Sequence, residues 1–151
     1  MRNPNTLAMV VVLVALILIG IPISKSIGDG RDLTPMEKIQ GGIYDPDAVV
    51  LATIGFDTEL NNGRMMDPKS PGLLYLAYLI EGYADFPEKV GPDRALPRLR
   101  ASHKVGDSAF FTQLEPEQTK LLERIKTAAQ KASERDRSLC AIGPQPALAC
   151  P

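Results

Sequence analysis

Apolar residues are concentrated near the start of the chain, where Leu7–Ile23 runs for seventeen residues without a charged side chain. Because no polar stripe occurs at helical spacing, the run is not an ordinary surface helix. At a rise of about 1.5 Å per residue it is roughly 25 Å long, close to the hydrocarbon thickness of a bilayer. We therefore expect a transmembrane signal anchor over residues 7–24 after a short cytoplasmic segment, residues 1–6. A signal peptide cleaved near Ser24–Ser26 and a core helix of a soluble domain are the alternatives.

The residues after this run predict a flexible spacer over 25–33 and then, over 34–137, a small, loop-rich domain. We expect its fold class to be mainly α with a minor β element. Thr34 followed by Pro35 is a helix-start pattern and predicts a short helix over Pro35–Gln40. Tyr44–Asp47 predicts a turn. The next residues, Ala48–Ile54, are an uninterrupted apolar run, rich in β-branched residues and closed by Gly55, which predicts a buried strand.

Two longer helices are predicted further along. Ser70 and Pro71 open the first, Gly72–Ala84, which is apolar on nearly every side. Such a helix is buried either in the core of its own domain or against a partner or a membrane surface. Its candidate partner-facing residues are Leu73, Leu76, Tyr78 and Ile80. The second, Pro116–Arg137, has a narrow apolar stripe at helical spacing and a charged opposite face, as expected for a helix packed on one side.

Between these helices, Phe86–Gly106 contains three prolines and is locally basic. The pattern predicts a solvated loop. The alternative is a docking surface for an acidic partner or for anionic lipid headgroups, formed by Arg94, Arg98 and Arg100.

The tail, residues 138–151, contains the chain's two cysteines, Cys140 and Cys150, on either side of a proline-containing stretch. A disulfide between them would close a small loop and contribute about 2–3 kcal/mol. Since disulfides persist in oxidising compartments, this pairing places the C-terminal domain outside the cytoplasm, on the periplasmic side. The positions of Lys and Arg around the apolar run do not decide the orientation. Free thiols in the tail are the alternative.

The composition limits the kinds of ligand that the chain can be expected to bind. The net charge of −1 with interspersed signs gives no electrostatic footprint for nucleic acid. Two cysteines and a single histidine cannot supply the four ligands of a structural zinc site, and there is no glycine-rich phosphate loop. We therefore expect no cofactor and no dedicated small-molecule ligand. His103 could act as a base with Ser102 or Ser108, although neither serine lies in a nucleophile motif.

Together these patterns predict a single-pass, membrane-anchored, non-enzymatic subunit or accessory protein of a larger membrane or envelope assembly. Its partners would be membrane lipid, through the N-terminal helix, and other proteins of the complex, through the extracytoplasmic domain. One alternative is a secreted or periplasmic binding module released by signal-peptide cleavage. Another is a small membrane-tethered hydrolase that uses His103.

Overall fold

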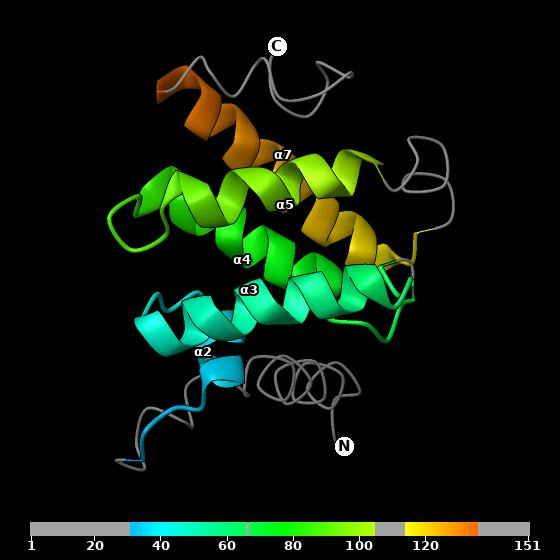
Figure 1. Ribbon diagram of the computed structural model, residues 1–151, viewed down its shortest axis with the longest axis horizontal. Helices are drawn as coiled ribbons and strands as arrows, with labels where there is room; N and C mark the ends of the chain where they lie inside the picture. The colour runs from blue at the N-terminus through cyan, green and yellow to red at the C-terminus, as the bar shows by residue number, and fades with distance from the viewer. Residues whose placement is uncertain (1–30, 66, 105–113, 136–151) are drawn as a thin grey trace, which may run out of the picture. The chain divides into compact units, whose positions relative to one another are not determined.

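The computed structural model describes residues 31–65, 67–104 and 114–135, and within these ranges it contains five helices and no strand (Figure 1). The prediction of a mainly α fold is therefore confirmed for this part of the chain. The expected anchor, Leu7–Ile23, and the tail with Cys140 and Cys150 lie outside the described residues. Of the described helices, none combines the length and the apolar character that crossing a membrane requires. The helices are α2 (Pro35–Gly41), α3 (Pro46–Asn61), α4 (Gly72–Asp85), α5 (Pro92–Lys104) and α7 (Pro116–Arg135).

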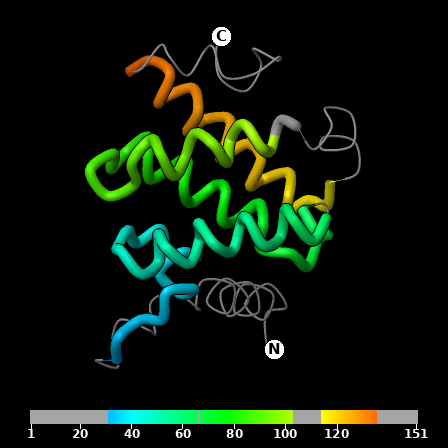
Figure 2. Tube along the Cα trace, viewed as in Figure 1, coloured from blue at the N-terminus to red at the C-terminus, as the bar shows by residue number. Residues whose placement is uncertain are grey.

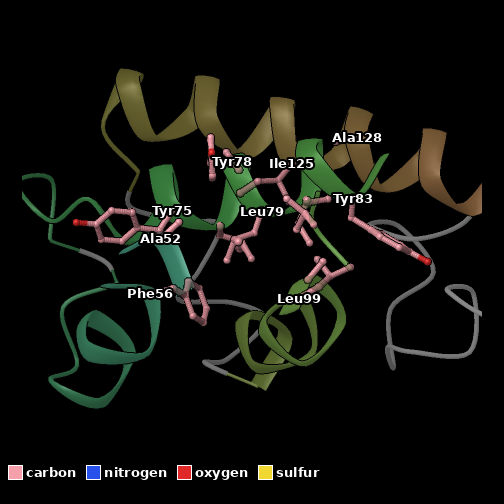
Figure 3. Packing of buried hydrophobic residues seen from close by; sticks show 14 of the residues in the cluster. Ala52, Phe56, Tyr75, Tyr78, Leu79, Tyr83, Leu99, Ile125 and Ala128 are labelled. Carbon is pink, nitrogen blue, oxygen red and sulfur yellow. The ribbon is translucent and has the colours of Figure 1, made fainter. Parts of the chain in front are cut away.

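The central helix is α4, which contacts all four of the others (Figure 2). Figure 3 shows Ile125 of α7 on one side of α4, with Phe56 of α3 and Leu99 of α5 on the other. A helix enclosed in this way needs an apolar surface all round, which is what the sequence of α4 provides.

Burial of α4 is nearly complete, and the helix predicted over Gly72–Ala84 is confirmed with one added residue. Each large aliphatic side chain taken out of water there contributes about 1.5–3 kcal/mol. The other helices of the chain thus cover the apolar surface of α4, for which the sequence allowed either a core position or a partner contact. The side chains of α4 that are almost fully buried are Leu73, Leu76, Ala77, Tyr78, Leu79 and Ile80.

The predicted strand Ala48–Ile54 is wrong, because these residues lie within the helix α3. The preceding Asp45 has an extended backbone, and its carboxylate accepts a hydrogen bond from the Ala48 N–H at 3.0 Å. Pro46 occupies the first helical position, where a missing N–H costs nothing. This cap starts a helix at a point that the sequence pattern alone had suggested was a turn before a strand.

The prediction of a solvated loop over Phe86–Gly106 is also wrong in part, since α5 lies within it. Ala95 and Leu99, four residues apart, are buried on the side that faces the core. Pro92 begins the helix, and Pro97 is tolerated inside it although it donates no hydrogen bond. The basic residues of the segment therefore lie on a helix, with Arg100 exposed and Arg98 paired with Asp57 of α3.

Helices α3 and α4 approach each other closely at Gly55. A Cβ atom at this position would lie within 2.9 Å of three ring atoms of Tyr75, including Cζ at 2.7 Å. Real Cβ atoms do not occur so close to other heavy atoms, so the absence of a side chain at Gly55 sets the distance between the two helices.

Candidate functional site

Exposed apolar side chains mark one candidate surface, on the outer side of α3. Val50 is 43% exposed and Ile54 is 60% exposed, and their spacing of four residues places them one above the other on that helix. The inner side of α3 carries Ala48, Ala52 and Phe56, which are fully buried. Helix α3 is therefore apolar on two sides, of which only one is covered by the described residues.

A small hollow of about 350 Å³ adjoins Val50, and two acidic and two basic residues line it: Asp45, Glu88, Lys89 and Arg94. The Arg94 side chain is half-buried, and no ion pair to it occurs among the described residues. A cation thus lies beside exposed apolar surface. We call the surface formed by Val50, Ile54 and Arg94 the α3–α5 face.

The three arginines predicted as a docking surface have different surroundings. Arg98 is held between helices: its Nη2 donates to Asp57 Oδ2 at 2.6 Å, and its Nη1 donates to the Arg94 carbonyl at 3.0 Å. Arg100 is exposed, whereas the Arg98 side chain is only 16% exposed. Arg94 and Arg100 therefore reach the surface, and Arg98 ties α5 to α3.

The four predicted partner-facing residues of α4 are placed differently from these arginines. All of them lie in the core described above, covered by helices of the same chain. What could have been found from the sequence is the exposed pair on α3, because Val50 and Ile54 are apolar residues left over once the inner side of that helix is assigned.

A larger groove of about 760 Å³ runs between the C-terminal end of α4, α7 and the α2–α3 connection, residues 42–45. Its apolar lining comes from Tyr44, Ala84, Phe86 and Ala128. Every charged side chain that lines it is already in an ion pair within the described residues. These pairs are Glu81–Arg124, Asp85–Lys131, Glu117–Lys120 and Glu123–Lys126.

Aromatic stacking builds one wall of this groove. The ring of Tyr44 stacks on Tyr78 with centroids 4.5 Å apart and lies 5.1 Å from the ring of Phe86. The close approach requires Gly82, since a Cβ there would come within 2.6 Å of Tyr44 Cε1. The Tyr78 hydroxyl donates to the Ile43 carbonyl at 2.8 Å, which fixes the α2–α3 connection against α4.

The phenol pKa values of Tyr44 and Tyr78 are both raised above the ordinary value. Burial raises the pKa of Tyr78 to about 12. Burial, followed by the nearby carboxylate of Glu81, raises the pKa of Tyr44 still further. Since both side chains stay protonated at neutral pH, neither supplies a general base. The groove is therefore suited to binding by shape and apolar contact.

A buried carboxylate joins α3 to α4. Glu59, whose side chain is 11% exposed, accepts hydrogen bonds from Arg64 Nη2 at 2.6 Å and from Ser70 Oγ at 2.8 Å. The Ser70 oxygen in turn accepts from the Gly72 N–H at 3.1 Å, at the start of α4. Because both carboxylate oxygens are engaged within the chain, the arrangement fixes the α3–α4 connection.

Candidate chemistry is sparse in the described ranges. No cluster of three or more His, Cys, Asp or Glu side chains there could hold a metal ion. Ser102 is buried and donates to the Leu99 carbonyl at 2.6 Å. The His103 side chain and Ser108 lie outside the described residues.

Comparison of the chain with models of known protein families, with curated proteins and with solved structures gave no match.

Proposed function

We propose that this protein is a membrane-anchored, non-enzymatic subunit or accessory protein of a larger membrane assembly, and that it contacts its protein partner through the α3–α5 face. The observation that carries the proposal is the exposed pair on α3, with Val50 43% and Ile54 60% exposed. Protein interfaces typically have an apolar centre surrounded by a polar rim. Arg94, beside Val50, supplies a cation that a carboxylate of the partner would pair with.

The expected anchor restricts where such a partner can be. Residues 24–34 separate the predicted span from α2, and eleven extended residues reach at most about 36–40 Å. A domain tethered in this way searches a thin layer next to the bilayer, so a partner in the same membrane meets it at a high effective concentration. A modest interface is then sufficient for assembly.

Site-specific photo-cross-linking in native membranes tests the proposal. A benzophenone amino acid replaces Ile54 in the full chain, and a control chain carries it at Gln130, which is exposed on α7. We expect a discrete cross-linked product from position 54, and a reduced yield of it when Val50→Lys is added. Equal products from positions 54 and 130, or none from either, would refute the role of the α3–α5 face.

The intact mass of the membrane-associated chain tests the tether separately. Retention of Met1–Ser26 is expected for an anchor, and its loss would favour a released binding module.

A further inference from the structure

The groove between α4 and α7 combines an apolar wall with charged side chains that neutralise one another. Three acidic and three basic side chains line it, and each is paired within the described residues. An occupant with its own charge would have to separate one of these pairs or remain uncompensated in the groove. The aromatic wall of Tyr44 and Phe86, with Phe86 39% exposed, favours an uncharged, apolar occupant.

One segment of this chain has that composition. Residues 138–151 contain no Asp, Glu, Lys, Arg or His, and Pro144 and Pro146 lie between two mainly apolar stretches. Prolines close together restrict the backbone to extended conformations, which lowers the entropy lost on binding. Grooves lined by aromatic side chains are the usual receptors for such segments.

The end of α7 brings this segment to the groove. Arg135 donates to the carbonyls of Tyr83 at 2.8 Å and of Ala84 at 3.1 Å, and its guanidinium lies 4.9 Å from the centre of the Tyr83 ring. Since Ala84 also lines the groove, the chain leaves α7 at the edge of the groove.

The length of the connection is sufficient. Nine residues lead from Arg135 to Pro144, and an extended chain of that length reaches about 30 Å. The groove follows α7 back from Lys131 to Lys120, a distance of about 17 Å at the rise of an α-helix. Every part of the groove is thus within reach of Pro144.

We infer that the groove between α4 and α7 binds residues 138–151 of the same chain, with Pro144 and Pro146 against Tyr44 and Phe86. A short connection gives the tethered segment an effective concentration on the order of millimolar, so even weak affinity keeps the groove occupied. An outside ligand for this groove would first have to displace the chain's own segment. The inference does not depend on the membrane anchor or on the α3–α5 face.

Photo-cross-linking within the full chain tests this inference. p-Benzoylphenylalanine replaces Phe86 in the groove or, as a control, Ile54 on α3, which does not line the groove. Trypsin releases residues 138–151 as one peptide, because no Lys or Arg follows Arg137. Isotopically light and heavy chains are mixed before irradiation, so that adducts within one chain carry a single label and adducts between chains carry both.

We expect single-label adducts between position 86 and residues 138–151, about a hundredfold or more above mixed-label adducts at micromolar chain concentration. Thr127→Arg, which adds bulk and charge at an exposed lining position, should remove most of this adduct. Gln130→Arg, exposed on the same helix but outside the groove, should leave it unchanged. Helical content measured by circular dichroism confirms that both variants fold.

Mixed-label adducts in the majority would mean that a second copy occupies the groove. Adducts to another protein, equal yields from positions 86 and 54, no adduct, or insensitivity to Thr127→Arg would each overturn the inference.

Discussion

Replacing Gly55 by Ala should lower the stability of the helical domain, although the same change stabilises most helices. In a helix interior Ala is favoured over Gly by about 1 kcal/mol. Here the added methyl would lie within 2.9 Å of three atoms of the buried Tyr75 ring. Forcing extra volume into a packed site costs about 1–3 kcal/mol, so the net loss should be about 0–2 kcal/mol.

The sign of the effect should reverse when the ring is removed. In a Tyr75→Leu background the overlap disappears, and Gly55→Ala should raise the free energy of unfolding by up to about 1 kcal/mol. Urea unfolding of residues 31–151, followed by circular dichroism for the four chains of this cycle, measures the coupling between the two positions. A coupling energy near zero, with Gly55→Ala stabilising in both backgrounds, would show that α3 and α4 do not meet at Gly55.

Four further results are expected. Asp45→Ala should lower the free energy of unfolding by about 0.5–2 kcal/mol, while Asp45→Asn keeps the cap of α3. Lys38 and the Ala48 N–H lower the pKa of Asp45 below 3.8, so the stabilising effect of this carboxylate should be present above about pH 4 and lost as the pH falls. Acid titration of wild type against Asp45→Asn measures this loss. Tyr78, with its pKa raised from 10.0 to about 12, should stabilise the fold fully below pH 10 and progressively less as the pH rises toward 12. Because the pKa of Tyr44 is raised as well, ultraviolet titration should show one late tyrosinate fewer in Tyr78→Phe than in wild type. Leu13→Arg should cost about 2.5–3.5 kcal/mol of membrane insertion, and carbonate-resistant sedimentation like that of wild type would contradict the predicted span. Cys140 and Cys150 should resist alkylation in intact cells until a reductant is added, and two modified cysteines without reduction would exclude the disulfide and the argument for orientation that depends on it.

The sequence predicted a helix correctly where its apolar residues followed a simple helical pattern. Helix α4 is apolar on all sides, and α7 carries a stripe through Leu122, Ile125 and Ala129, so both could be predicted with nearly correct ends. It failed for α3 because Val50 and Ile54 add a second, exposed apolar side, which fills the gaps in the helical period and imitates a buried strand.

The cap at Asp45 and Pro46 was visible in the sequence but was interpreted as a turn. For α5, three prolines outweighed the four-residue spacing of Ala95 and Leu99, although Pro92 at the first helical position is a start signal. The groove could not be predicted, since it depends on residues from α4, α7 and the α2–α3 connection that tertiary packing brings together. Two of the ion pairs that make it neutral, Glu81–Arg124 and Asp85–Lys131, join residues more than forty positions apart in sequence.

The central position of α4 has a consequence for synthesis on the ribosome. Fifty residues separate the end of α4 at Asp85 from the end of its main partner α7 at Arg135. At about 5–20 residues per second, several seconds pass between the two, on the order of 3–10 s. During that interval α3 can cover one side of α4, while the side that later receives α7 has no partner in the nascent chain. A chaperone that acts on the nascent domain would find its target in this interval, on the apolar surface that includes Tyr83.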